Sequence, residues 1–92
     1  MKLVWSDHAR DERGDIMTYI AADNPVAAIE LDELFMEHAN SLKRFPYIGR
    51  PGALADTREL TVHPNYRLIY EIAEETVRIL NVIHARREWP KG

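Results

Sequence analysis

Hydrophobic residues recur along the chain with two different spacings, and the change between them separates helices from strands. The segment 2–5 is apolar enough to form one short strand. Helical spacing follows it and predicts helices over about 7–22 and 25–44. The apolar faces of these helices are formed by Ala9, Ile16, Met17 and Ile20 in the first, and by Ala28, Leu31, Leu34, Phe35, Ala39 and Leu42 in the second.

The break between the two predicted helices contains its own start signals. Ser6 and Asp7 are both suited to cap the first helix. Asn24 is a good N-cap for the second helix, and Pro25 is a good first helical residue. So short a connection predicts that the helices form an antiparallel hairpin.

The second half of the chain has the composition of strands separated by tight turns. Residues 45–52 contain two prolines and two glycines and are predicted to form a loop. Three segments rich in β-branched and aromatic residues then predict an antiparallel meander, with strands over 57–62, 66–72 and about 76–85.

We therefore predict one α+β domain over 1–92, with elements in the order β-α-α-β-β-β. A small antiparallel sheet carries the antiparallel helical hairpin on one face, and the first strand lies at an edge beside the last strand. The last strand is nearly all apolar and is predicted to be central. The other face of the sheet stays partly bare and is a candidate docking surface.

Alternation along the strands sorts the candidate functional side chains by face. Tyr66, Leu68, Tyr70 and Ile72 are expected to face the helices, which places Arg67 on the opposite face. The same alternation groups Arg78, Leu80, Val82, His84 and Arg86. The prediction is that Arg67, His84 and Arg86 meet on the face away from the helices, bordered by Arg58 and His63.

Two interpretations of this group remain open from the residues alone. In the functional one, the group is a small cationic site with a histidine available for proton transfer. In the structural one, Arg67 pairs with Glu71 or Glu59, and His84 only completes a strand. Trp89 is similarly open, either as an exposed anchor for a partner or as a lid over the sheet edge.

Composition and charge exclude several classes of protein. The chain has 92 residues, a net charge of −3 and no cysteine, so disulfide scaffolds and thiolate sites are excluded. Its histidines lack metal-site spacing, and we expect no cofactor and no metal. No apolar stretch approaches the roughly 20 residues that cross a bilayer, and the first residues do not resemble a signal peptide. We expect a cytoplasmic protein that does not bind membranes.

Charge is distributed unevenly between the two halves. Residues 1–43 hold 4 basic and 9 acidic side chains, a net charge of −5, whereas residues 44–92 hold 8 basic and 6 acidic ones, a net charge of +2. The overall balance disfavours a protein whose whole surface binds nucleic acid, because such binding depends on many Lys and Arg contacts to phosphate.

The segments 57–60, 63–72 and 77–90 resemble the RelE/ParE superfamily, the toxins of bacterial type II toxin–antitoxin operons. The most specific parts of the resemblance are 66–70 and 84–90, and it covers essentially the whole chain. It implies a toxin that causes growth arrest, by one of two modes of action. RelE-like members cleave mRNA on the ribosome, and ParE-like members inhibit DNA gyrase without catalytic residues of their own.

The nuclease pattern of the superfamily is only partly present. Its arginines fall on Arg58, Arg67 and Arg86, but its second basic position in the strand over 57–62 falls on the uncharged Leu60. The C-terminal tyrosine of that pattern would lie near Gly92, where there is none. If the chain is a nuclease, its catalytic set is Arg58, Arg67, His84 and Arg86, with His63 or His84 moving the proton.

The ending 84–90 is more similar to the ParE branch, which implies a gyrase inhibitor of the kind that stabilises plasmids. The alternatives are a ribosome-dependent mRNA endoribonuclease and an inactive member that only binds its antitoxin. All three imply a cognate antitoxin and a hetero-oligomer with it. The residues expected to bind the target or the antitoxin are Arg58, His63, Arg67, His84, Arg86, Arg87 and Trp89. We expect the antitoxin to place a basic amphipathic element along the helices and an acidic or apolar contact near Arg67 and Arg86.

Overall fold

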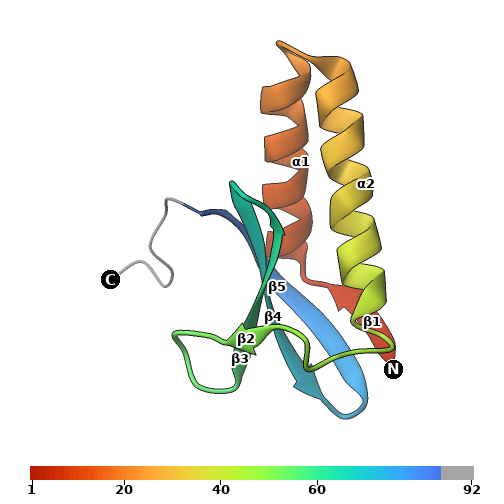
Figure 1. Ribbon diagram of the computed structural model, residues 1–92, viewed down its shortest axis with the longest axis vertical. Coiled ribbons are helices and arrows are strands. Elements are labelled where there is room, and N and C mark those ends of the chain that lie inside the picture. Colours follow the sequence, from red (N-terminus) through yellow and green to blue (C-terminus); the bar gives the residue numbers. More distant parts are fainter. Residues whose placement is uncertain (86–92) are drawn as a thin grey trace.

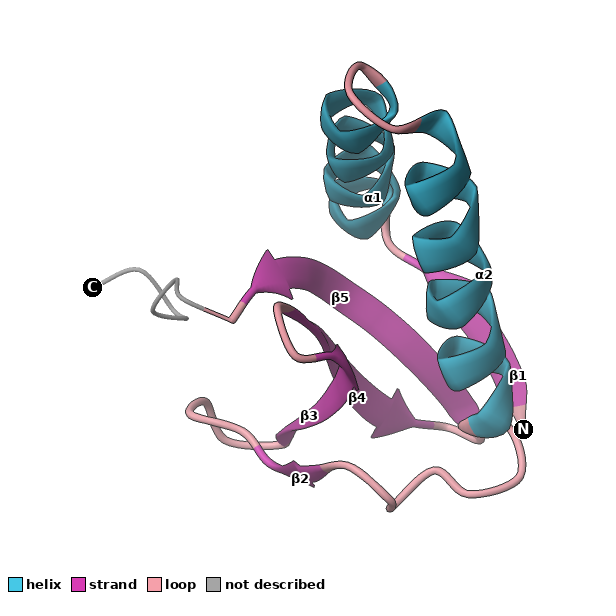
Figure 2. Ribbon diagram, turned by 45° about the horizontal axis from the view of Figure 1, so that its top comes forward, coloured by secondary structure: helices cyan, strands magenta, loops and turns pink. Residues whose placement is uncertain are grey.

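The computed structural model describes residues 1–85, in which a five-stranded sheet carries a helical hairpin on one face (Figures 1 and 2). The strands lie in the order β1-β5-β4-β3-β2, so β5 is an interior strand as predicted. The predicted α+β class and element order are confirmed. In chain order the elements are β1 (Lys2–Trp5), α1 (Asp7–Ala21), α2 (Pro25–Ser41), β2 (Arg50–Pro51), β3 (Thr57–His63), β4 (Tyr66–Ala73) and β5 (Thr76–His84).

The sheet differs from the prediction in two respects. It is mixed rather than antiparallel, because β1 pairs in parallel with β5 along its whole length. The predicted loop over 45–52 also contains the short strand β2, in which Arg50 lies opposite Glu59 of β3. Composition concealed this strand, because a two-residue pairing beside a proline has no periodicity of its own.

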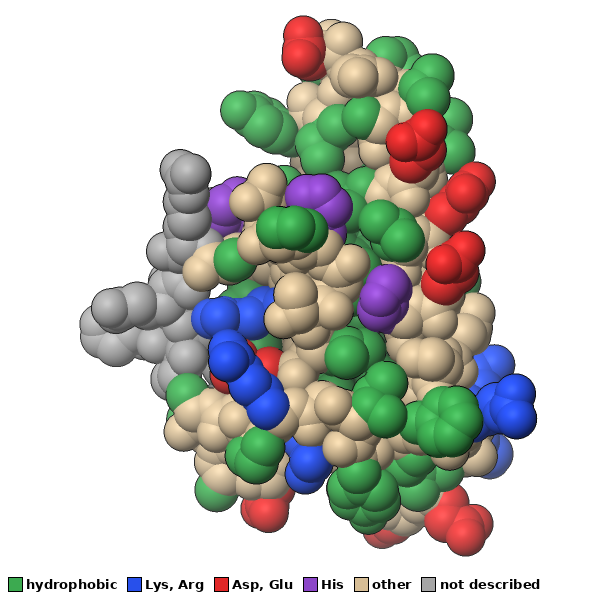
Figure 3. All heavy atoms as spheres, viewed as in Figure 1, with side chains coloured by type: hydrophobic (Ala, Val, Ile, Leu, Met, Phe, Trp, Pro, Cys, Tyr) green, Lys and Arg blue, Asp and Glu red, His purple; other side chains and the backbone are tan. Residues whose placement is uncertain are grey.

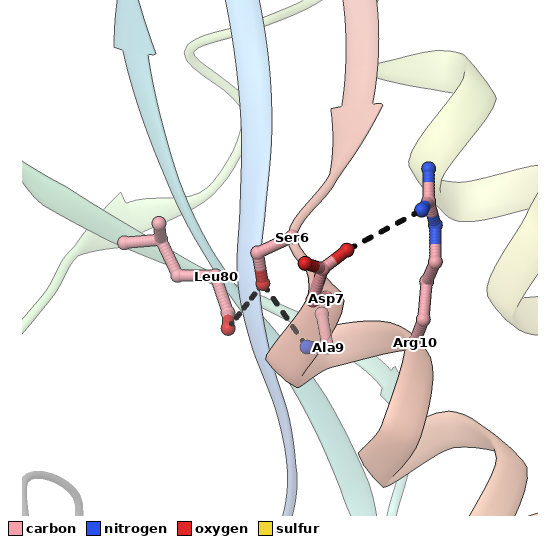
Figure 4. Close-up of polar contacts among 5 residues, drawn as sticks. All are labelled: Ser6, Asp7, Ala9, Arg10 and Leu80. Carbon is pink, nitrogen blue, oxygen red and sulfur yellow. Dashed lines mark hydrogen bonds and ion pairs between the residues drawn. The ribbon is translucent and has the colours of Figure 1, made fainter.

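Both helices begin at the predicted caps. The Ser6 hydroxyl accepts a hydrogen bond from the amide of Ala9 at 3.0 Å (Figure 4), and the Asn24 side chain accepts one from the amide of Ala27 at 3.1 Å. Of the two candidates for the first cap, the structure selects Ser6. Neither α1 nor α2 is long and apolar enough to cross a membrane, and no other helix is described.

A charged contact between α1 and α2 reinforces the hairpin. The guanidinium of Arg13 binds both carboxylate oxygens of Asp32, at 2.6 and 3.0 Å. The same guanidinium lies over the Trp5 ring, 5.0 Å from its centroid. Arg13 therefore connects β1, α1 and α2, and its two parallel hydrogen bonds fix the relative position of the helices better than a single contact would.

The main core lies between the hairpin and the sheet. The apolar faces predicted for both helices pack into it, with Phe35 and Leu42 fully buried. From the sheet, β4 contributes the side chains predicted to face the helices, including the fully buried Leu68 and Tyr70. The tip of the hairpin extends beyond the sheet (Figure 1), where side chains such as Tyr19 remain exposed.

β5 contains one extra residue relative to β4. Ile69 lies opposite Asn81, but the next residue, Tyr70, lies opposite Ile79, so Leu80 has no partner on β4. An extra residue of this kind is a β-bulge, and it reverses the alternation of side chains along the remainder of the strand. The predicted faces of β5 are therefore wrong for Val82 and His84.

Two side chains from neighbouring elements bind the backbone at this bulge. The Ser6 hydroxyl donates to the carbonyl of Leu80 at 3.0 Å (Figure 4), and Oε1 of Glu12 accepts from the amide of Val82 at 3.1 Å. Because β1 ends one residue before Ser6, no strand is present to pair with these backbone groups. The two side chains supply the missing partners and thereby favour the bulged form of β5.

Replacing Ser6 by alanine is expected to lower the free energy of unfolding by about 1–2 kcal/mol, because one hydroxyl caps α1 and binds the bulge. Urea unfolding followed by circular dichroism measures this change. Ser41→Ala is the matched control. The Ser41 hydroxyl donates only to the carbonyl of His38 in its own helix, so the loss there should stay below about 0.5 kcal/mol. Equal losses in the two variants would show that the bulge contact contributes nothing.

Candidate functional site

The candidate residue Arg67 lies on the sheet face away from the helices, as predicted. Its Nε is 3.4 Å from Oε1 of Glu59, and Nη2 of Arg50 lies 3.4 Å from the same oxygen. The Glu59 side chain is 8% exposed and that of Arg67 is 18% exposed. A nearly buried carboxylate is thus held between two guanidinium groups, one from β4 and one from β2.

This contact shows which of the two proposed carboxylates pairs with Arg67. Arg67 pairs with Glu59, and the other proposed partner, Glu71, instead lies 3.8 Å from Arg78. Because Glu59 compensates part of its charge, Arg67 offers a weaker attraction to a phosphate than an isolated surface arginine. Ile69 and Ile83, on the same face as Arg67, are buried, so that face is less bare than predicted.

His84 does not lie beside Arg67, and the prediction that they meet on one face is wrong. His84 is opposite Tyr66 in the register, and their ring centroids are 5.2 Å apart in an edge-to-face arrangement. Tyr66 packs against the main core and meets Phe35 edge-on at 5.8 Å. His84 is therefore on the helix side of the sheet, because the bulge at Leu80 reverses its direction.

His63 joins this histidine–tyrosine group rather than the arginine group. It lies opposite Tyr66 from the β3 side, with ring centroids 6.1 Å apart. Its Nδ1 accepts a hydrogen bond from the amide of Asn65 at 3.1 Å, which stabilises the turn between β3 and β4. The row His63, Tyr66, His84 thus crosses three strands at one end of the sheet.

A groove of about 490 Å³ lies between this end of the sheet and α1. It combines two acidic side chains with aromatic, histidine and aliphatic ones, so it suits an apolar segment that carries a positive charge. In Figure 3, acidic side chains lie along the hairpin, and the Lys and Arg side chains of this view lie below it. The groove is lined by Glu12, Asp15, Ile16, Tyr19, Tyr66, Val82 and His84.

Arg58 occupies a third position. It lies opposite Tyr70 in the register, four residues along β4 from Tyr66. Its Nε donates to the carbonyl of Gly49 at 3.0 Å, its Nη2 donates to the carbonyl of Tyr47 at 3.2 Å, and its guanidinium stacks on the Tyr47 ring. These contacts make Arg58 a structural support for the loop that precedes β2.

The described candidate residues therefore do not form one site. Arg67 is on one face of the sheet, whereas His84 and Arg58 are on the other, separated by four residues of β4, or about 13 Å. The remaining candidates, Arg86, Arg87 and Trp89, lie outside the described residues, and their predicted roles stay predictions.

Sequence reasoning missed several residues on which this arrangement depends. Glu12 is one of them, because its carboxylate binds the bulge of β5. Tyr70 was predicted to be a core residue, but its hydroxyl also binds the loop before β2. Glu59 was considered as a pairing partner but not as a buried one. Only Glu59 had a visible signal, since a carboxylate that alternates with Leu60 on a strand faces away from the core.

Comparison with known proteins connects this fold to one family. The family described as ParE toxin of type II toxin–antitoxin system, parDE, matches residues 3–89. The Caulobacter vibrioides protein named Toxin RelE2 is 35% identical over 86 residues, which is 94% of this chain and 97% of that protein. A Sinorhizobium fredii protein that carries a toxin name, Y4kP, is 33% identical over 91 residues, which is 98% of this chain and 94% of that protein.

Two solved structures share the fold. A chain of the chromosomal ParDE system from P. aeruginosa superposes with a TM-score of 0.82 and 19% identity, covering 91% of this chain and 95% of that one. A YoeB/ParE toxin from Agrobacterium tumefaciens superposes with a TM-score of 0.64 and 16% identity, covering 91% and 98%. At these identities the matches establish the fold alone.

Replacing Glu59 by glutamine is expected to lower the free energy of unfolding by about 2 kcal/mol, because the largely buried guanidinium of Arg67 loses the carboxylate that compensates its charge. Arg50→Gln removes the other arginine of the cluster. The Arg50 side chain is 69% exposed, so the expected loss is below about 1 kcal/mol. Urea unfolding of both variants measures the difference, and a Glu59→Gln protein as stable as Arg50→Gln would contradict the buried pairing.

Proposed function

The chain belongs to the ParE toxin family of type II toxin–antitoxin systems, and on that premise we propose that it acts by binding DNA gyrase rather than by cleaving RNA. The observation that carries this proposal is the separation of Arg58, Arg67 and His84. Cleavage of a phosphodiester needs a cation and a proton-transfer group within a few ångströms of the same phosphate. Residues on opposite faces of a sheet do not meet this condition, whereas binding of a protein target does not require it.

The contacts of each arginine support the same conclusion. Two donors of Arg58 are engaged by backbone carbonyls, and Arg67 is paired with a buried carboxylate. Electrostatic stabilisation of a phosphoryl transition state depends on donors that are directed at the reacting group. Arginines whose donors bind the protein itself are better suited to holding a surface in shape.

A RelE-like endoribonuclease is the second candidate, and one comparison favours it. The relative named Toxin RelE2 is 35% identical and matches nearly its whole length. In this case the groove between α1 and the sheet would be the reactive site, because it places His84 beside Tyr66 and the carboxylates of Glu12 and Asp15. The acidic lining opposes entry of a phosphate backbone, which is why we rank this candidate second.

Membership of the family implies an antitoxin protein as a partner. We place its neutralising segment in the groove, with a basic residue of the antitoxin facing Asp15 and apolar side chains beside Ile16 and Tyr19. This proposal retains the expected basic amphipathic element along the helices. The second expected contact, near Arg67, would lie on the opposite sheet face, so one antitoxin segment reaches both only by passing around an edge of the sheet.

The purified protein, added to DNA gyrase with relaxed plasmid and ATP, is expected to abolish supercoiling and to leave linear DNA after detergent treatment. Cognate antitoxin added beforehand should restore supercoiling, which controls for contaminating nucleases. The proposal fails if gyrase remains fully active at high molar excess of protein whose fold is confirmed by circular dichroism. Codon-phased mRNA cuts in a translation extract would then identify the endoribonuclease. Expression without growth arrest would identify a member that only binds its antitoxin.

Asp15→Lys is expected to weaken antitoxin binding about tenfold or more, because it reverses the charge on the wall of the groove. Asp11→Lys is the matched control, since Asp11 is an exposed carboxylate of the same helix that does not line the groove. Isothermal titration of both variants with the antitoxin separates a local effect from a change in net charge. Similar affinities for the two variants would place the antitoxin elsewhere.

A further inference from the structure

The loop between α2 and β3 exposes an unusual amount of apolar surface. Four of its large apolar side chains are 44–67% exposed, namely Phe45, Tyr47, Ile48 and Leu54. We call residues 44–54 the apolar loop. It lies at the opposite end of the molecule from the tip of the helical hairpin (Figure 1), so it is separate from the groove beside α1.

The backbone of the apolar loop is held by a buried tyrosine. The hydroxyl of Tyr70 donates to the carbonyl of Pro46 at 2.7 Å and accepts from the amide of Gly49 at 3.0 Å. Tyr70 itself is fully buried in the core. A Cβ atom at Gly49 would come within 2.6 Å of the Tyr70 hydroxyl oxygen and 2.8 Å of the Glu59 carbonyl oxygen, so only glycine allows this close approach.

Arg58 holds the same loop from β3. Its two hydrogen bonds to the carbonyls of Gly49 and Tyr47 fix the peptide group that precedes Ile48 and the one that follows Gly49. Its guanidinium also lies 5.3 Å from the centroid of the Tyr47 ring. Four hydrogen bonds from two side chains therefore hold a short segment whose own side chains point largely into solvent.

A fixed loop with exposed apolar side chains has the properties of a binding surface. Exposed apolar groups gain nothing from contact with water, and a mobile loop could bury them against its own protein. Here the hydrogen bonds keep the side chains of Tyr47 and Ile48 exposed to solvent. A surface held in its binding conformation loses less entropy when a partner docks, and aromatic side chains are frequent anchors of protein interfaces.

Charge around the apolar loop indicates what kind of partner fits it. Residues 38–55 contain Lys43, Arg44 and Arg50 and no acidic residue. Arg44 lies over the Phe45 ring, 5.6 Å from its centroid, and the N-terminal amine donates to the carbonyl of Lys43 at 3.4 Å. An acidic partner surface with an apolar centre is complementary to this combination.

A protein fits this surface better than a nucleic acid does. Arg58 has two of its donors bound to backbone carbonyls, and Arg50 is paired with Glu59, so few cationic groups remain to bind phosphates. Affinity for a nucleic acid depends on several such contacts. The exposed aliphatic side chains of Ile48 and Leu54 offer apolar area, which a nucleic-acid backbone does not match.

We propose that the apolar loop is the surface with which this toxin contacts its target, a folded protein that presents an acidic and apolar patch. The inference rests on the proposed function in that it takes the target to be a protein. A rigid surface suits a folded target, because two preformed surfaces dock with little ordering. A neutralising segment that is disordered when free adapts to whatever surface it meets and does not require such rigidity.

The test is the double variant Tyr47→Ser/Ile48→Ser, assayed for growth arrest and for inhibition of purified gyrase. Both side chains are more than half exposed, so the fold should persist, as checked by thermal unfolding. We expect inhibition to weaken about tenfold or more, with antitoxin affinity unchanged within about twofold. The matched control is Val26→Ser/Ile29→Ser, which removes two similarly exposed apolar side chains of α2 and should leave inhibition unchanged.

A second pair of variants tests the charge of the partner. Lys43→Glu/Arg44→Glu is expected to weaken inhibition about tenfold at low salt and less at high salt, since attraction between exposed charges is screened. Arg10→Glu reverses an exposed charge on α1 and is the control. Photo-crosslinking from position 47 to purified gyrase should yield an adduct with a protein subunit. An adduct with the DNA alone would overturn the proposal.

The remaining outcomes separate the failure of this inference from the failure of the proposed function. If the unmodified toxin arrests growth but leaves gyrase active, gyrase is not the target, and loss of growth arrest in Tyr47→Ser/Ile48→Ser still decides the role of the loop. If that variant keeps full activity, the inference is wrong. It is equally wrong if the variant loses only antitoxin binding, or if the unmodified protein forms dimers that this substitution dissociates.

Discussion

The contact of Ser6 and Glu12 with the backbone of β5 is the constraint on which the surface chemistry of this protein depends. It stabilises an extra residue at Leu80 just beyond the end of β1, where β5 has no strand partner on its β1 side. The described side chains from Val82 onward are turned to the opposite face. Val82 consequently joins the core, and His84 points toward the helices instead of toward Arg67. The extra residue at Leu80 thus separates His84 from Arg67, which regular alternation would have placed together in a cationic site.

Buried polar groups have a second role, which is to hold surfaces in shape. The Tyr70 hydroxyl is in the core, yet it binds the loop that carries Tyr47 and Ile48. Glu59 is nearly buried, yet it holds Arg67 and Arg50 at the sheet face that points away from the helices. Because an unpaired buried polar group is unfavourable, each of these contacts favours one arrangement of the residues around it. The apolar loop and the face that carries Arg67 are therefore preformed.

These surfaces differ in charge in a way that suits a toxin with two protein partners. The groove beside α1 has acidic walls and is matched by a basic amphipathic segment, which we assign to the antitoxin. The segment that contains the apolar loop, residues 38–55, carries basic side chains and no acidic one, and it is matched by an acidic surface, which we assign to the target. Because the apolar loop shares no lining residue with the groove, substitutions in one surface should separate neutralisation from toxicity. Arg67, on the far face, stabilises the sheet through its pair with Glu59.

The sequence by itself determined the elements, their order and the apolar faces of the helices, because these follow from local caps and from spacing along one segment. Ser6, Asn24 and Pro25 mark helix starts by residue types and positions that are visible within one segment. It also determined the family, through the segments around 66–70 and 84–90. Only the tertiary structure decided which side chains meet. The bulge at Leu80 depends on Glu12, some 70 residues away, and the loop at Gly49 depends on Tyr70. No pattern within a single segment records such contacts, since each one forms only when distant parts of the chain pack together.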